Sequence, residues 1–172
     1  MKLLTKVTAS NQKRLRIVFG VIFIYMMAII SIQIVAPNSV VEPDNFPNSC
    51  PENSMNCTLI GPNPHRGEGI MEIRFNSNFS NIMEEVGLWS QSEPRTEVLG
   101  KWSNQIHIVF RSYLWKFPDD FIVNLHCDEG ETVMYIYSKS RLGIDDLGVN
   151  DDRVSKFVEH ISEVEISTSM CL

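Results

Sequence analysis

The chain has 172 residues, a net charge of −6 and 44% hydrophobic residues. Five cations and no anion precede residue 17, so the remainder carries −11. Such an acidic chain repels phosphate backbones, because binding nucleic acid requires Lys and Arg to displace condensed counterions. The composition therefore argues against nucleic acid as a partner.

The first feature along the chain is an apolar run from Ile17 to Val35 that contains no charge. At about 1.5 Å per residue, such a helix crosses most of a hydrocarbon core about 30 Å thick. We predict a transmembrane helix at residues 17–36, acting as a signal-anchor after a basic cytoplasmic tail at 1–16. A cleaved signal peptide has a shorter apolar run and a small-residue cleavage site. It is the weaker alternative, because Pro37 directly follows Ala36.

The charges around this run predict the orientation of a single-pass protein. After the run, no Lys or Arg occurs before Arg66. Because cations stay on the cytoplasmic side, the N-terminus should be cytoplasmic and the C-terminal domain lumenal, extracellular or periplasmic. The basic, acid-free residues 1–16 also fit a mitochondrial presequence, so the mitochondrial inner membrane stays open.

Residues 37–66 contain six of the eight prolines and read as an extended linker. This linker contains Cys50 and Cys57. Disulfides persist outside the cytoplasm, and four cysteines allow three pairings. We favour a Cys50–Cys57 disulfide, with Cys127 and Cys171 either paired or free. The alternative is a zinc site that adds one histidine from His65, His107 and His126, but the usual C-x(2–4)-C spacing is missing.

Periodicity from residue 70 onward predicts one domain at residues 67–165, followed by a C-terminal tail at 166–172. Alternating apolar residues predict strands, and apolar residues at helical spacing predict one helix capped by Asn78 and ended by Gly87, and a second around Val154 to Ile161. The predicted strands are Ile70–Phe75, Glu97–Trp102, Gln105–Ser112, Phe121–Cys127 and Thr132–Ser138. This order predicts an α+β fold, with two helices on one face of a mostly antiparallel sheet of four to five strands. His107 and His126 fall on the polar strand faces, where surface histidines are expected.

The connection between the last strand and the last helix has an unusual composition. Gly143 and Gly148 permit a shaped backbone, and Asn150 stands where an N-cap is expected. We expect Arg141 and Arg153 to form ion pairs with the acids at 145 and 146, which would tie this loop to the start of the helix.

The run S-x-S-R-x-G-x-x-D-L-G-x-N-x-x-R, from Ser138 to Arg153, resembles the hallmark of the domain of unknown function 1499 family. Two shorter segments, Phe117 to Asp120 and Cys50 to Cys57, are similar to other motifs of that family. The chain departs from the pattern at residues 58–60 and 151–152. The resemblance implies no established reaction, substrate or cofactor.

The polar residues of this motif form our candidate ligand-binding site: Ser138, Ser140, Arg141, Asp146, Asn150 and Arg153. A helix N-terminus offers N–H groups to a ligand. Four aspartates nearby oppose an anionic ligand, however, so we favour the alternative that the motif is mainly a scaffold.

Two N-x-S/T sequons begin at Asn56 and Asn78, and they matter only for a lumenal domain in a eukaryote. Glycosylation is favoured at Asn78. At Asn56 it would compete with the disulfide at Cys57.

No catalytic fingerprint, cofactor-binding loop or metal motif occurs, so no catalytic residue, cofactor or metal is predicted. Our first hypothesis is a membrane-anchored, non-enzymatic binding or structural module that recognises an unknown protein. The second is a carrier of a lipid or other apolar ligand in a cavity between sheet and helices. The third is a hydrolase that uses the Ser, Asp and Arg residues of the motif.

Overall fold

The structure is a computed structural model that describes residues 2–171, with side chains from Asn11 to Cys171. Met1 and Leu172, at the ends of the predicted tails, lie outside the described residues. The regular elements are α1 (Lys2–Val35), β1 (Cys57–Ile60), β2 (Ile73–Phe75), α2 (Phe79–Ser92), β3 (Thr96–Lys101), β4 (Gln105–Arg111), β5 (Pro118–Asp128), β6 (Glu131–Ser140) and α3 (Val149–Glu163), with short 3-10 turns at Pro43–Asn45 and Gly67–Gly69.

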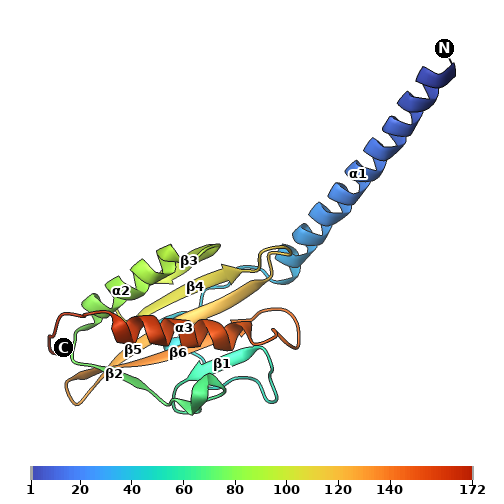
Figure 1. Ribbon diagram of the computed structural model, residues 1–172. Helices are drawn as coiled ribbons and strands as arrows, with labels where there is room; N and C mark the ends of the chain where they lie inside the picture. The colour runs from blue at the N-terminus through green and yellow to red at the C-terminus, as the bar shows by residue number, and fades with distance from the viewer. Residues whose placement is uncertain (1, 172) are drawn as a thin grey trace.

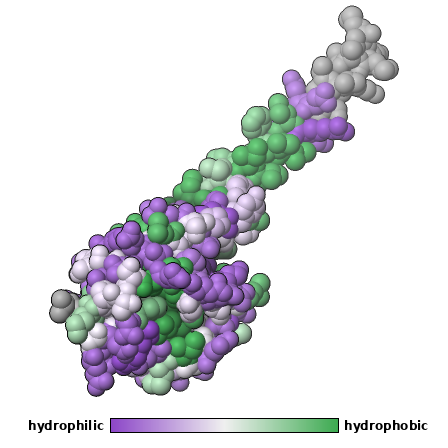
Figure 2. All heavy atoms as spheres, turned by 60° about the vertical axis from the view of Figure 1, so that its left-hand side comes forward, coloured by the Kyte–Doolittle hydropathy of each residue, from purple (hydrophilic) through white to green (hydrophobic). Residues whose placement is uncertain are grey.

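Helix α1 projects from the domain as a stalk (Figure 1). Its stretch Asn11–Val35 is long and apolar enough to cross a membrane, and none of it is buried against the protein. Figure 2 shows a hydrophilic end on this stretch and a hydrophobic column between that end and the mostly hydrophilic domain. A helix segment that is apolar all round and largely uncovered by protein is more stable in lipid than in water. The chain therefore has one candidate membrane-spanning helix among its described residues.

The domain contains one antiparallel sheet with the strand order β1-β6-β5-β4-β3, and β2 also pairs with β6. The predicted α+β class is confirmed. The sheet has six strands, one more than the upper expectation, because the segment predicted as a linker supplies β1. In β1, Cys57 pairs with Lys139 and Ile60 with Ile136 of β6.

Helices α2 and α3 cover one face of the sheet (Figure 1). The core between the layers is apolar and centred on aromatic rings, with Trp89 of α2 at 5.1 Å from Phe121 and 4.7 Å from Phe157 between ring centroids. Asn78 caps α2 as predicted, since its side chain accepts a hydrogen bond from the backbone N–H of Asn81. The prediction that Gly87 ends this helix is wrong. The apolar stripe continues beyond it, and burial of Trp89 keeps the chain helical to Ser92.

The opposite face of the sheet is covered by residues that follow α1. Val41, Phe46 and Cys50 pack against a second apolar cluster on that face. This cover corrects the expectation that His107 lies on the surface, because His107 is fully buried beneath it. The backbone N–H of Val41 donates to His107 Nδ1 at 3.1 Å. His107 Nε2 must then carry the ring proton, which it donates to Asp120 at 2.7 Å.

The four cysteines form two pairs. Cys50 and Cys57 are bonded with their Cα atoms 5.9 Å apart, as favoured from the sequence. This pairing uses both thiols that the zinc alternative requires. Cys127 and Cys171 are also bonded, with a Cα–Cα distance of 5.8 Å. The second pair fastens the described part of the C-terminal tail to the end of β5, so this tail belongs to the packed domain.

Candidate functional site

The N-terminus of α3 is shaped by Asp146. Gly148 precedes the helix in the left-handed region with φ 85°, and Asn150 is the second helical residue. The prediction that Asn150 is the N-cap is therefore wrong. Asp146 accepts from the backbone N–H of Gly148 at 3.0 Å and of Asn150 at 2.7 Å. Burial raises the pKa of Asp146, but hydrogen bonds from Asn150 and Gly148 and the charge of Arg66 outweigh burial, so its pKa lies below the usual value.

Asn150 is fully buried and joins the motif residues into one network. Its Oδ1 accepts from Ser138 Oγ and from Arg153 Nη1, both at 2.6 Å. Its Nδ2 donates to Asp146 Oδ2 at 2.6 Å and to Ser140 Oγ at 3.0 Å. We call these five residues the Asn150 network. The structure thus brings together five of the six residues predicted for the site.

The sixth residue, Arg141, lies on the other face of the sheet. It pairs with Asp120 at 2.6 Å, beside His107. Burial raises the pKa of Asp120, but hydrogen bonds from His107 and Arg141 overcome that effect and hold it below its usual value. The expected pairing of Arg141 and Arg153 with Asp145 or Asp146 is wrong.

Arg153 extends from α3 across the sheet. Its guanidinium pairs with Asp119 at 2.9 Å and lies 4.4 Å from the centroid of the Phe110 ring. A guanidinium over an aromatic face is attracted by the ring quadrupole, so two contacts hold this side chain in place. Arg153 is the member of the Asn150 network that lines a cleft beside α2.

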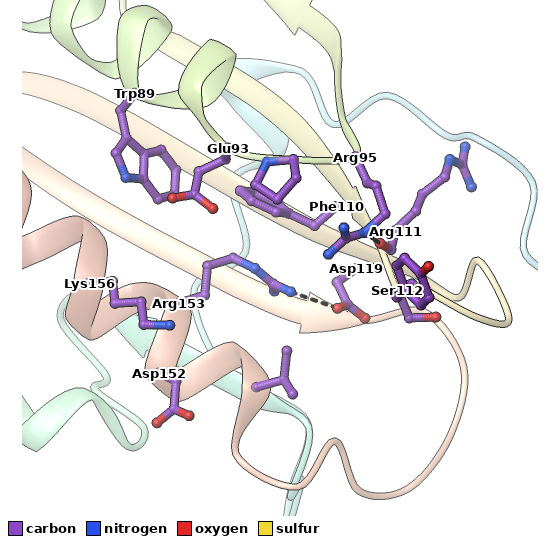
Figure 3. Close-up of a pocket in the computed structure, with 13 residues that line it drawn as sticks. Trp89, Glu93, Arg95, Phe110, Arg111, Ser112, Asp119, Asp152, Arg153 and Lys156 are labelled. Carbon is purple, nitrogen blue, oxygen red and sulfur yellow. Dashed lines mark hydrogen bonds and ion pairs between the residues drawn. The ribbon is translucent and has the colours of Figure 1, made fainter.

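That space is a cleft of about 400 Å³ between the C-terminal end of α2, the adjoining ends of β4 and β5, and the start of α3. Figure 3 shows Trp89 and Phe110 on one side of Arg153, with Asp152 and Lys156 on the α3 side. The lining residues are Trp89, Glu93, Pro94, Arg95, Phe110, Arg111, Ser112, Tyr113, Asp119, Val149, Asp152, Arg153 and Lys156. The cleft therefore combines an aromatic wall with a rim that carries four cations and three carboxylates.

A smaller cavity of about 230 Å³ lies on the other side of Asp119. It is lined by Ser140 and Asp146 of the Asn150 network and by the motif loop at Gly143. The two cavities share Asp119, and the motif thus lies between two hollows of the surface.

Most of the cleft lining was not predicted as a site. Trp89 and Phe110 belong to the apolar core, and little of either side chain borders the cleft. Asp119 was noted only as part of the segment Phe117 to Asp120 that is similar to a family motif. One signal for Asp119 was present in the sequence. The side chains of adjacent strand residues point to opposite faces of the sheet. Asp119 and Asp120 should therefore lie on different faces, where each could pair with one of the two motif arginines.

The two sequons have different environments. Asn56 is buried, and its Nδ2 donates to the carbonyl of Gly143 at 2.7 Å. This contact leaves its amide nitrogen inaccessible to a glycan. Asn78 is half-buried at the cap of α2, and its glycosylation stays a prediction.

The polar groups of the motif form hydrogen bonds mainly with one another. The Ser138 hydroxyl donates to Asn150 and accepts from Arg153. His107 is buried and could act as a general base by its chemistry. It lies with Asp120 on the opposite face of the sheet from Ser138. A serine nucleophile needs a base within hydrogen-bond reach. Ser138 has amide and guanidinium partners instead.

No curated protein matches the chain in sequence. A family model described as "Protein of unknown function (DUF1499)" matches residues 30–161, which run from the end of α1 through all six strands and α2 to the last turn of α3. This match covers well over half of the chain, and the protein therefore belongs to the DUF1499 family.

Proposed function

We propose that this protein is a membrane-anchored binding module whose domain lies outside the cytoplasm and holds an amphipathic ligand in the cleft beside Arg153. The observation that carries the proposal is the cleft itself, a 400 Å³ hollow with an aromatic wall and a charged rim. Ligand sites typically have this size, with an apolar lining and a few placed polar groups.

The topology is supported by two features. The five cations before residue 17 favour a cytoplasmic N-terminus and a single pass through α1 as a signal-anchor. The two bonded cysteine pairs fit an oxidising compartment. Protease added outside intact cells should then digest the domain and spare the N-terminal tail, and the reverse pattern would contradict this orientation.

The lining suggests how a ligand would be held. Trp89 and Phe110 line the cleft on the side of an apolar body, although they are only 5% and 7% exposed, while Arg95 and Lys156 stand at the rim for a negatively charged head group (Figure 3). Arg153 is already engaged by Asp119 and Asn150. The Asn150 network therefore acts as the scaffold of the cleft wall, and the ligand contacts come from neighbouring elements.

Two alternatives have less support. A hydrolase would need a base beside a serine, whereas Ser138 is bound by Asn150 and Arg153. A purely apolar ligand fits the aromatic wall but leaves the charges of the rim without a role. A partner protein that inserts an amphipathic side chain into the cleft remains within the proposal.

The test uses full-length protein in lipid nanodiscs, with Trp102 and Trp115 replaced by Phe so that Trp89 is the sole tryptophan. Titration with octyl phosphate below its micelle concentration should change the Trp89 emission in a saturable way. Lys156→Gln should weaken binding about fivefold, equivalent to about 1 kcal/mol. Lys139→Gln, on the other face of the sheet, is the matched control. A response that does not saturate, or equal effects of both variants, would refute the proposal.

A further inference from the structure

The loop between β4 and β5 carries an unusual set of exposed side chains. Tyr113 is 77% exposed, Leu114 53%, Trp115 42% and Phe117 38%. The loop is well ordered, because the Ser112 N–H donates to the Phe117 carbonyl and Ser112 Oγ accepts from the Phe117 N–H. Four neighbouring large apolar side chains held toward solvent on a closed loop indicate contact with another phase or partner.

Contacts with α1 show which surface this loop meets. The Tyr25 hydroxyl donates to the Leu114 carbonyl at 2.7 Å, and Gln33 Nε2 donates to the Lys116 carbonyl at 3.2 Å. The Tyr25 and Trp115 rings lie 5.8 Å apart. The loop therefore lies against the last turns of the candidate membrane-spanning helix, as Figure 1 also shows at the base of α1.

The position along α1 sets the depth of the loop. Tyr25 lies ten residues before Val35, or about 15 Å along the helix axis. The candidate span Asn11–Val35 has 25 residues and is about 37 Å long, against a hydrocarbon core of about 30 Å. Placing the hydrocarbon core at the N-terminal end of this stretch leaves the loop farther out by only about 7 Å. The loop tip still overlaps the lipid when α1 spans the bilayer.

We infer that residues 113–117 form a second membrane-inserted element, which enters the lipid leaflet beside α1. Backbone carbonyls in lipid need internal donors, and Tyr25 and Gln33 supply them for two carbonyls of the loop. Tyr and Trp are the side chains preferred at the membrane interface. Arg95 and Lys116 flank the Tyr113 ring at 5.5 Å and 6.0 Å, so cations stand at the level of lipid head groups.

The neighbouring loop between β6 and α3 extends this apolar surface. Its Arg141 N–H donates to the Pro118 carbonyl, and its Ile144 and Leu147 are 85% and 90% exposed. Contacts of the β4–β5 loop, the β6–α3 loop and α1 with the lipid then determine how the domain is tilted on the bilayer. Since Tyr113 also lines the cleft, this insertion places the mouth of the cleft next to the head groups.

The inference rests on the proposed anchoring by α1, and the test separates the two. Full-length protein is reconstituted in phosphatidylcholine vesicles whose acyl chains carry bromine, which quenches tryptophan emission on contact. We expect quenching in the wild type, loss of that quenching in Trp115→Phe, and unchanged quenching in Trp102→Phe, whose residue lies in the β3–β4 turn.

Three results would overturn the insertion. Protein retained by the vesicles after carbonate washing, but without a quenching difference between wild type and Trp115→Phe, would contradict the loop insertion and leave the anchor intact. Extraction by carbonate would contradict the anchor itself. Cross-linking between two copies through residues 113–115, without quenching by bromolipid, would assign this surface to a second copy of the chain.

Discussion

Asp119 and Asp120 are neighbours in β5, yet they organise the two faces of the sheet in different ways. On the helix-covered face, Asp119 pairs with Arg153, and the pair borders an open cleft. On the other face, Asp120 receives Arg141 and His107 under the segment that follows α1. Arg141 Nη1 also donates to the Pro37 carbonyl at 2.7 Å.

The two faces of the sheet therefore differ in what their ion pairs can do. The first ion pair leaves a surface hollow beside it, which suits binding. The second is closed and links α1 to the domain through residues 37–41, because the Val41 carbonyl also accepts a hydrogen bond from Gln105 at 2.7 Å. Strand β5 therefore borders a candidate ligand site on one face of the sheet and an attachment to α1 on the other.

Removal of Asn150, the centre of the polar network on the helix-covered face, should affect stability most. Asn150→Ala leaves Ser138, Asp146 and Arg153 with unmet hydrogen bonds in a buried place, and it should lower the free energy of unfolding by about 4 kcal/mol. Urea unfolding of the full-length protein in detergent micelles measures this loss. Asn63→Ala, at an exposed position, should stay within about 0.5 kcal/mol of the wild type. If both variants lost a similar free energy of unfolding, the Asn150 network would contribute no more to stability than an exposed side chain.

The second face is tested by Asp120→Asn. This change keeps the shape but removes the charge that Arg141 and His107 bind, and it should cost about 2 kcal/mol, as expected for charge-assisted hydrogen bonds. It should also expose the connection after α1, so limited proteolysis within residues 37–56 should become faster. Asp119→Asn is the matched control, because it should destabilise the domain without exposing that connection. Equal cleavage in both variants would contradict the division of tasks.

Acid pH should weaken the interactions of the buried carboxylates on both faces of the sheet. Asp120 and Asp146 have folded pKa values below their usual ones. Their contribution to stability is present above the unfolded value of about 4 and is lost as the pH falls through the lower folded values. Thermal unfolding followed by circular dichroism should show a falling Tm below pH 4. Asp120→Asn should flatten this dependence in part, and an unchanged slope would rule out Asp120 as a source.

The net pKa shift of Tyr137 is opposite to that of the two aspartates, because burial, helped by the negative charge of Asp120, raises its pKa to about 12. Ionisation of this phenol opposes folding only in strong alkali.

A small effect on stability is expected from the contact between α1 and the β4–β5 loop. Tyr25→Phe removes one hydrogen bond to the Leu114 carbonyl, and interhelical side-chain hydrogen bonds in membranes average about 0.6 kcal/mol. Unfolding in mixed micelles should detect a loss of this size. Tyr113→Phe, which leaves that bond intact, serves as the control. A gain in stability would show that the loop carbonyl is satisfied by water.

Local patterns predicted much of this molecule. The apolar run, the Asn78 cap, the alternation in β4, β5 and β6 and the stripe of α3 are each visible within a short window of sequence. Two of the errors share one cause. His107 and Gly87 were judged from their own elements, while their environment is decided by residues 37–50 and by the packing of Trp89.

The candidate site likewise combines features that local sequence predicts with contacts that depend on the tertiary structure. Composition and periodicity are properties of neighbouring residues, so they were enough to predict a shaped polar connection, which lies at residues 141–148, and an acidic domain that follows a helix able to span a membrane. Only the tertiary structure decided that Arg153 meets Asp119, that Arg141 meets Asp120, and that an aromatic loop lies beside Tyr25. These partners are far apart in the chain, and strand register and sheet face determine which of them come within contact distance.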